Sequence, residues 1–379
     1  MESKYVAVSE ITDEKGAVRE EDVNKCGPAQ CFGLFLAICL IGGACVVSTQ
    51  TAGYDNSGFN WVDTAQNVMC RFQFCVLFWL YGTAVLFYHS RFVDINWIAK
   101  PTTPPEGSLE LPSAIEIWAK TPTPARHAAC FAGGSAVSFA LTHFWMTFFE
   151  PGCQRALCIC QMIMLAWWQI LWYVGMYNKI DKDSDVKLPW TNFFKHESVV
   201  EIFMFSITAF LVLSQGTHEW KTPEDGEVTG TDRVRTWTIR VIFSLLFLLF
   251  SFNGLAKHDN LVSDKVAGSV VTKGSDPAQT WSSTPTQAKF IAVEGAGWCA
   301  HNFCTYVSMT FLAPGCEKGL CKCIALTMIW WNIVWYIGML GRVDFNDPIK
   351  RPWINFFKNE TVQELILFSG FGYLGFLAK

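Results

Sequence analysis

The chain contains a long internal repeat, in which residues 146–206 recur at residues 309–369 with a constant offset of 163. Close to half of the aligned positions are identical, and both copies contain the sequences Pro-Gly-Cys and Pro-Trp-x-Asn-Phe-Phe-Lys. This period is far longer than the roughly 20 to 50 residues of solenoid repeats, so each unit must contain several secondary-structure elements. The repeat therefore predicts two small units of the same fold.

Long apolar stretches dominate the composition. The chain is 51% hydrophobic and only 16% charged, whereas about a quarter of the residues of a soluble domain are charged. Nine stretches are long enough to cross a hydrocarbon core of about 30 Å as helices. We predict these spans at residues 31–50, 69–90, 127–149, 157–177, 197–215, 236–256, 288–312, 320–340 and 361–379.

The distribution of basic residues between the loops predicts the orientation of the spans. Lys and Arg gather in the N-terminal tail and in the second, fourth, sixth and eighth loops, and the first loop has none. Cytoplasmic loops carry such an excess of basic residues, so we expect a cytoplasmic N-terminus and an exoplasmic C-terminus. The tail before Cys31 is acidic and shows no cleavable signal peptide. We expect an integral protein of the plasma membrane or of a secretory-pathway organelle.

The repeat and the spans together predict an all-α polytopic membrane protein with two parallel four-helix repeats and a terminal helix. An even number of spans per unit gives both copies the same orientation. The expected parts are an acidic cytoplasmic tail at 1–30, repeat units at 31–193 and 194–356, and a terminal helix at 357–379 that begins an incomplete third unit. The lipid bilayer is the expected partner, and a homo-oligomer or a larger membrane complex remains open.

Each copy carries the motif Pro-Gly-Cys-x4-Cys-x-Cys in a predicted exoplasmic turn, where the compartment is oxidising and disulfides persist. Three thiols per copy without a neighbouring histidine leave a tetrahedral zinc site incomplete, so disulfides or buried thiols are favoured over a metal. Cys70 or Cys75 is a further pairing partner for one of these cysteines. The disulfide candidates are Cys153, Cys158, Cys160, Cys316, Cys321 and Cys323.

Each copy also has a Trp-Trp-amide triplet near the middle of a span, followed by Trp-Tyr. Tryptophan normally concentrates at the membrane interfaces, and an amide in hydrocarbon must find a partner or line a wet cavity. The triplets predict either a ligand site between the units or an aromatic packing seam with an interhelical hydrogen bond. The residues concerned are Trp167, Trp168, Gln169, Trp172, Trp330, Trp331, Asn332 and Trp335.

His143, His301 and Glu294 are polar residues within predicted spans, and they align in the other copy with Tyr306, Ser138 and Phe131. Ionisable groups inside a membrane are functional candidates. Neither histidine has a second histidine at a spacing that suits haem. We expect His143 and His301 to flank the tryptophan site and to form hydrogen bonds across helices.

The sequence has no phosphate-binding loop, no metalloprotease or hydrolase motif and no basic patch suited to nucleic acid. Its loops do not exceed about 40 residues, which leaves no room for a soluble catalytic domain of ordinary size. We therefore expect no enzyme, no nucleic-acid partner and no particular cofactor. The expected function is a transporter or channel for a small polar or organic solute. The alternatives are a scaffolding protein that assembles laterally and an intramembrane lipid-, pigment- or haem-binding protein.

Overall fold

A computed structural model describes residues 61–94, 112–176, 180, 198–214, 229–263, 275–339, 343 and 361–378. All regular secondary structure in these residues is helical, which confirms the all-α fold class. A helix lies at each predicted span from the second to the ninth, whereas the first predicted span, 31–50, lies outside the described residues.

The first copy comprises four long helical segments. The first is α3 (Trp61–Leu77), which continues through a π-helical turn (Phe78–Gly82) into α4 (Thr83–Leu86). The second is α6 (Thr123–Phe149), and the third is α7 (Gln154–Ile170), which ends in a π-helical turn (Leu171–Met176). The fourth is α8 (Ser198–Leu213). With 27 residues, α6 is about 40 Å long.

The second copy repeats this order. Its first segment is α9 (Gly230–Leu246), a π-helical turn (Phe247–Ser251) and α10 (Phe252–Ala256). There follow α13 (Thr286–Leu312), then α14 (Glu317–Ile333) with its π-helical turn (Val334–Met339), and then α15 (Thr361–Gly372), extended by Tyr373–Leu377.

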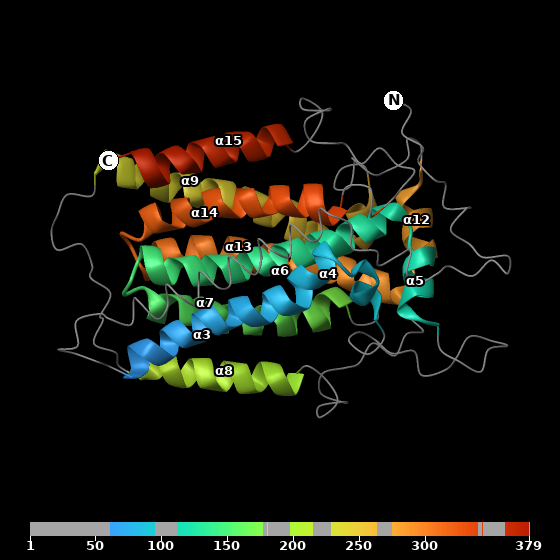
Figure 1. Ribbon diagram of the computed structural model, residues 1–379, viewed down its shortest axis with the longest axis horizontal. Helices are drawn as coiled ribbons and strands as arrows, with labels where there is room; N and C mark the ends of the chain where they lie inside the picture. The colour runs from blue at the N-terminus through green and yellow to red at the C-terminus, as the bar shows by residue number, and fades with distance from the viewer. Residues whose placement is uncertain are drawn as a thin grey trace.

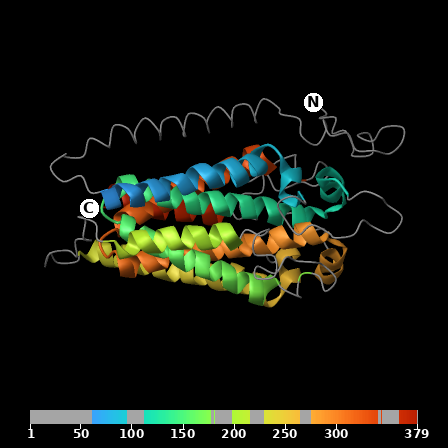
Figure 2. The same ribbon diagram turned by 90° about the horizontal axis from the view of Figure 1, so that it is seen from below.

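The two copies point the same way along the bundle. Short helices α5 (Ala114–Lys120) and α12 (Pro277–Ser283) precede α6 and α13, and both lie at the same end in the two views of Figures 1 and 2. Short 3-10 helices, His89–Val93 and His258–Val262, precede α5 and α12 respectively. Each short helix begins at a capping side chain, because Ser113 forms a capping box with Glu116 and Asp276 accepts from the Ala278 amide.

One correction concerns the offset between the copies. The offset of 163 holds for α6 and α13, but α3 and α9 are related by 169, because the first copy has six more residues between its 3-10 helix and α5. Side-chain contacts support the new alignment. Arg71 Nε donates to Thr147 Oγ1 at 3.1 Å, and the equivalent Arg240 donates to Thr310 Oγ1 at 2.9 Å. Each guanidinium also lies over the phenylalanine that follows its threonine.

The Pro-Gly-Cys motifs form the tight turns that join α6 to α7 and α13 to α14. Gly152 has a φ of 107° and Gly315 has a φ of 98°, a conformation that glycine adopts without a steric penalty. Cys153 Sγ donates to the Met146 carbonyl at 3.8 Å, and Cys316 Sγ donates to the Met309 carbonyl at the same distance. The motif thus closes the end of one helix and starts the next.

The copies interleave around a central pair of helices, α6 and α13. Helix α7 of the first copy packs against α13 of the second, and α14 packs against α6. Helix α8 packs against α7 and α3, while α15 packs against α14. The predicted unit boundaries at 194 and 357 place α8 and α15 at the start of the following units, and this division stays a prediction because contacts also run between the copies.

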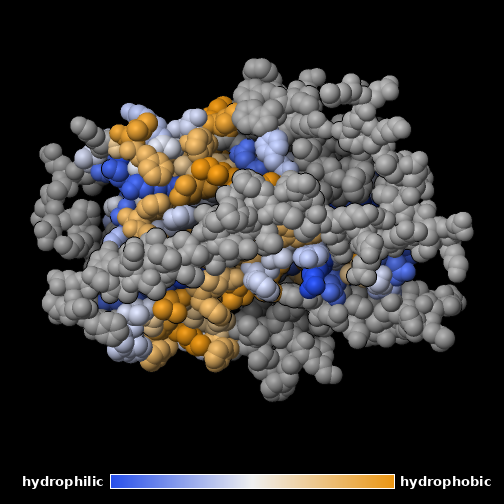
Figure 3. All heavy atoms as spheres, viewed as in Figure 1, coloured by the Kyte–Doolittle hydropathy of each residue, from blue (hydrophilic) through white to orange (hydrophobic). Residues whose placement is uncertain are grey.

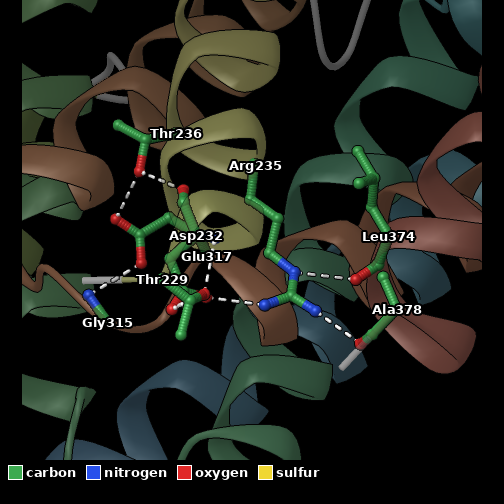
Figure 4. A network of polar contacts seen from close by, with 8 residues as sticks. All are labelled: Thr229, Asp232, Arg235, Thr236, Gly315, Glu317, Leu374 and Ala378. Carbon is green, nitrogen blue, oxygen red and sulfur yellow. Dashed lines mark hydrogen bonds and ion pairs between the residues drawn. The ribbon is translucent and has the colours of Figure 1, made fainter. Parts of the chain in front are cut away.

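A polar network fixes the chain end to α9 (Figure 4). Arg235 is 3% exposed, and its guanidinium donates to the carbonyl of Leu374 at 2.8 Å and to that of Ala378 at 2.7 Å. Its third contact is Asp232, at 2.6 Å. In the first copy Gln66 takes the equivalent place and donates to the Leu211 carbonyl at 2.9 Å. Each copy therefore ties its first long helix to the end of its last.

Large apolar side chains cover the outside of the bundle, and Figure 3 shows them gathered over α8 and near α15. Two described helical segments, Trp61–Leu86 and Glu317–Met339, are long and apolar enough to cross a membrane, and Phe203–Leu213 and Leu365–Leu377 are shorter apolar segments. The other predicted spans stay predictions. Exposed apolar side chains include Phe203, Phe210, Leu213, Trp237, Leu248, Phe252, Ile366 and Leu377.

Candidate functional site

Small residues bring α6 and α13 into close contact at the centre of the bundle. A Cβ atom on Gly295 would lie 3.0 Å from Cβ of Ala132 and 3.4 Å from the Ala128 carbonyl oxygen. Helices in membranes commonly approach each other through such small residues, because these allow backbone packing. The central pair leaves little space between its backbones, so larger side chains lie on its flanks.

A tryptophan from each copy lies against a glycine of the other copy. Trp331 on α14 lies over Gly134 of α6, and Trp168 on α7 lies over the equivalent Gly297 of α13. The indole nitrogen of Trp330 also donates to the Gly134 carbonyl at 3.1 Å. Each glycine therefore provides the room that an indole ring occupies on the flank of the central pair.

The structure divides the predicted tryptophan site into two equivalent places. Trp168 lies where α7 packs against α13, and Trp331 lies where α14 packs against α6. Their surroundings differ, because Trp331 stacks on Phe131 with ring centroids 4.8 Å apart, and Phe131 aligns with Glu294 in the other copy. The two tryptophans therefore contact different helices of the central pair.

The other predicted site residues have different surroundings. Trp335 lies on His127, with ring centroids 5.2 Å apart, and Trp167 lies 6.1 Å from Phe247. Asn332 Nδ2 donates to the Met328 carbonyl of its own helix at 2.8 Å, rather than across helices. The side chains of Gln169 and Trp172 lie outside the described part of the structure.

His301 lies in an aromatic cage that the sequence only partly indicates. Its ring centroid is 4.9 Å from that of Trp168, 5.1 Å from that of Trp298 and 5.9 Å from that of Phe139. His301 is 1% exposed, and neither of its ring nitrogens has a hydrogen-bond partner among the described residues. An imidazole that is buried without a hydrogen-bond partner destabilises the fold, so His301 is a candidate for a functional rather than a structural role.

His143 lies against the same Phe139 ring. The two ring centroids are 4.2 Å apart, and His143 Nδ1 is 3.1 Å from the Phe139 carbonyl of its own helix. The structure thus brings His143, His301 and Trp168 to the same region. Among the described residues, His301 does not form the predicted hydrogen bond across helices, whereas that of His143 stays a prediction.

Glu294 and Tyr81 extend this region, and the sequence-based site omits both. The hydroxyl of Tyr81 donates to Glu294 Oε1 at 2.6 Å, and the indole of Trp298 donates to the same oxygen at 3.3 Å. Glu294 is only 8% exposed. The signal in the sequence was an acidic residue within an apolar helix, whereas nothing in the sequence identifies Tyr81 as its partner.

The six motif cysteines are free thiols in the structure, as are all the described cysteines, so the predicted disulfides among them are not formed. Two of these cysteines have a structural role in the turns, because Cys153 and Cys316 donate to backbone carbonyls at the ends of α6 and α13. Cys160 Sγ lies 4.0 Å from the Thr305 carbonyl. The six side chains are buried in one cluster with Cys70 and Cys299.

Among the residues that the structure describes, no group of three or more His, Cys, Asp or Glu side chains is arranged to hold a metal ion. No protein-family model matches the chain, and no curated protein or solved structure is detectably similar to it. The functional argument therefore depends on the geometry of the region that contains Glu294, Tyr81, Trp298, His301 and His143, which we call the α13 polar region.

Proposed function

We propose that this chain is a multi-pass membrane transport protein with nine spans, a cytoplasmic N-terminus and an exoplasmic C-terminus, and that the α13 polar region handles protons during transport. The apolar outer faces of α8, α9 and α15 support an environment of lipid. The common direction of the two copies along the bundle agrees with the parallel repeat that an even number of spans per unit predicts.

The observation that carries this proposal is the pair of buried ionisable residues on one face of α13. Glu294 and His301 are seven residues apart, which places them two turns apart on the same face at about 10 Å. Trp298 lies between them, donates to Glu294 and contacts the ring of His301. A carboxylate and an imidazole can each hold a proton, and a proton would cross the distance between them through bridging water, because transfer requires a hydrogen bond or one intervening water.

The first copy shows that the fold does not need these ionisable groups. The positions of Glu294 and His301 correspond to Phe131 and Ser138, which fill the equivalent places on α6. Phe131 is accommodated by stacking on Trp331. Because an apolar or small residue serves the packing in one copy, the charged residue in the other copy requires a functional explanation.

Further polar groups continue along the same helices toward the Pro-Gly-Cys end. Asn302 Nδ2 donates to the Ser135 carbonyl at 2.9 Å across the central pair, and Tyr306 shares a hydrogen bond of 2.7 Å with Thr142. These contacts and the α13 polar region together form a line of polar groups inside an apolar bundle. Such a line is typical of a path for protons or small polar solutes.

Proton flux in reconstituted liposomes tests the proposal. Liposomes that contain the purified protein and a trapped pH-sensitive dye are given a potassium diffusion potential with valinomycin. We expect the internal pH to change faster than in protein-free liposomes. Glu294→Gln removes the ionisable group while conserving shape, and it should reduce the rate to that of protein-free liposomes.

Glu116→Gln is the matched control, because Glu116 is an acidic residue at the exposed start of α5 and glutamine also suits a capping box. This variant should keep the wild-type rate. Equal rates for the wild-type protein, Glu294→Gln and empty liposomes would exclude proton transport.

A scaffolding role is the second candidate, and the tryptophan positions favour it. Trp168 and Trp331 fill the spaces over Gly297 and Gly134, so the flanks of the central pair are packed aromatic surfaces. The apolar outer faces would then bind copies of the chain or other membrane proteins. Mass measurement of the protein in nanodiscs distinguishes the two roles, since scaffolding predicts a stable oligomer without proton flux.

A further inference from the structure

Arg240 on α9 is held against the last turn of α13 by two hydrogen bonds. Its Nε donates to Thr310 Oγ1 at 2.9 Å, and its Nη2 donates to the Thr310 carbonyl at 3.2 Å. An α-helix would satisfy this carbonyl with the amide four residues later, but that residue is Pro314, which has no N–H. The Pro-Gly-Cys turn thus fixes the position of the guanidinium group.

Two exposed aromatic side chains flank this guanidinium. Its Cζ lies 3.9 Å from the centroid of the Phe311 ring and 5.9 Å from that of Trp237. Both aromatic side chains are 63% exposed, and Arg240 is partly exposed between them. A guanidinium has five N–H donors, and among the described residues Thr310 accepts from two of them. Donors therefore remain for a ligand at the surface of the bundle.

The charge of Arg240 has no carboxylate partner in the described part of the chain. Arg235, one and a half turns earlier on α9, is paired with Asp232 at 2.6 Å. Arg240 has no acidic group within ion-pair distance among the same residues. An uncompensated charge beside exposed aromatic rings is stable only with water or with an anion from outside the chain.

The position of Arg240 along α9 favours an anion that belongs to the membrane. Arg240 lies about 7.5 Å beyond Arg235 along the helix, and it is the last charged residue before Lys257. The exposed side chains that follow are apolar and include Val241, Leu245, Leu248 and Phe252. In a bilayer this arrangement places Arg240 where the hydrocarbon core meets the headgroups.

The first copy repeats the arginine but not the whole site. Arg71 donates to Thr147 and lies 4.3 Å from the Phe148 centroid, whereas the position of Trp237 is occupied by Val68. A tie between helices does not by itself require a guanidinium, because Gln66 forms one with a neutral amide. The charge of the arginine therefore requires a reason beyond helix packing.

We propose that Arg240, Trp237 and Phe311 bind the headgroup of an anionic phospholipid in the leaflet at the Pro-Gly-Cys end. The remaining guanidinium N–H groups donate to phosphate oxygens, for which the planar fork of arginine is well suited. A headgroup with a net charge of one neutralises the single uncompensated charge of Arg240. The two aromatic rings contact the glycerol and the upper acyl chains. This inference rests on the membrane placement given under the proposed function, but not on transport.

Native mass spectrometry of the delipidated full-length protein in detergent tests the site, with phosphatidylglycerol as the probe. We expect saturable binding that is about tenfold tighter than the binding of phosphatidylcholine. Arg240→Gln should weaken the binding of phosphatidylglycerol by about tenfold, because it removes the charge and the fork. Inorganic phosphate at the same concentration should not displace the lipid, since it lacks the acyl chains.

Arg233→Gln is the matched control, because Arg233 is an exposed arginine on the same helix and the substitution removes the same charge. Its affinity for phosphatidylglycerol should equal that of the wild-type protein. A second measurement needs no variant. Phosphatidylglycerol with a photoreactive diazirine near the glycerol end of one acyl chain should label wild-type peptides that contain Trp237 or Phe311. This labelling decides the question if Arg240→Gln fails to fold.

Equal affinity of the wild-type protein for the two lipids would overturn the proposal, as would equal affinity of wild-type protein and folded Arg240→Gln for phosphatidylglycerol. Labelling confined to other peptides would overturn it as well. Release of the protein from membranes by alkaline carbonate would overturn both this site and the membrane placement. Proton flux is measured separately, so selective lipid binding without flux would support the lipid site and contradict transport alone.

Discussion

The indole of Trp331 lies over Gly134, so that a Cβ atom at this glycine would be 2.7 Å from Cζ3 of the ring. Gly134→Ala should therefore force the ring from its place and separate α14 from α6. Overpacking of this kind costs about 1 to 3 kcal/mol. We expect a lower thermal unfolding midpoint of the detergent-solubilised protein, measured by tryptophan fluorescence.

Gly370→Ala is the control for this substitution, because a Cβ atom at Gly370 on α15 meets no atom within 4 Å. Where a helix has room for the added Cβ atom, alanine should stabilise the folded state by about 0.5 to 1 kcal/mol relative to glycine. An unchanged midpoint in Gly134→Ala, with the control behaving as expected, would contradict the close packing of Trp331.

Arg235→Ala should release the chain end from α9. The guanidinium donates to two carbonyls at the end of the last helical segment, and hydrogen bonds from charged groups contribute about 1.5 to 3 kcal/mol each. We expect a destabilisation of about 3 kcal/mol or more. Hydrogen exchange of the backbone amides of Tyr373–Leu377 should also be faster than in the wild-type protein.

The equivalent substitution in the first copy, Gln66→Ala, removes one neutral hydrogen bond, to Leu211. Its cost should be about 1 kcal/mol, and it should not change the hydrogen exchange of Tyr373–Leu377. If both substitutions lowered the free energy of unfolding by the same amount, the three contacts of Arg235 would not contribute to stability as the structure indicates.

Hydropathy located the helices well but could not orient them. It predicted helices at α6 and α13 from the apolar stretches at 127–149 and 288–312, and the structure has helices there. It could not show that Gly134 faces Trp331, because lipid is as apolar as a protein interior and leaves inward and outward faces alike in composition. The division of the predicted tryptophan site follows from this loss of information.

Contacts between distant residues were also beyond the sequence. Glu294 stood out as an acidic residue in an apolar segment, yet its partner Tyr81 lies 213 residues away in the chain. The Pro-Gly-Cys motif was correctly predicted to form a turn. In this turn the glycine adopts a positive φ, and the cysteine donates to a carbonyl at the helix end rather than forming a disulfide within the motif. One repeated motif can thus reflect local backbone geometry alone.

The pH dependence of stability should show one contribution from Glu150, in the turn after α6. Burial raises the pKa of Glu150 from 4.5 to about 7, and the nearby Lys322 opposes part of this rise. Because the folded state favours the protonated form, the contribution is fully present below pH 4.5 and is lost as the pH rises through about 7. Unfolding midpoints between pH 4.5 and 8 should therefore fall with rising pH.

Glu150→Gln should flatten this part of the profile, since glutamine stays neutral. The second copy has Ala313 at the equivalent position, so Glu150→Ala is a further neutral variant that the repeat already contains. A profile of the wild-type protein that has the same slope as that of Glu150→Gln would show that Glu150 titrates without effect on folding.

His301→Phe should stabilise the fold while it impairs transport. Neither ring nitrogen of His301 has a hydrogen-bond partner among the described residues, and a buried polar group left in this way costs about 1 to 3 kcal/mol. Phenylalanine is of similar shape and suits a cage of Trp168, Trp298 and Phe139, so the thermal midpoint should rise. Residues kept for function at the expense of stability behave in this way, and the liposome assay should show a lower proton flux for the same variant.

His143→Phe is the comparison, because it removes a histidine whose Nδ1 already contacts the Phe139 carbonyl, and its midpoint should rise less. A lower midpoint in His301→Phe would mean that the imidazole has a partner in the native membrane, and unchanged flux would remove His301 from the transport path.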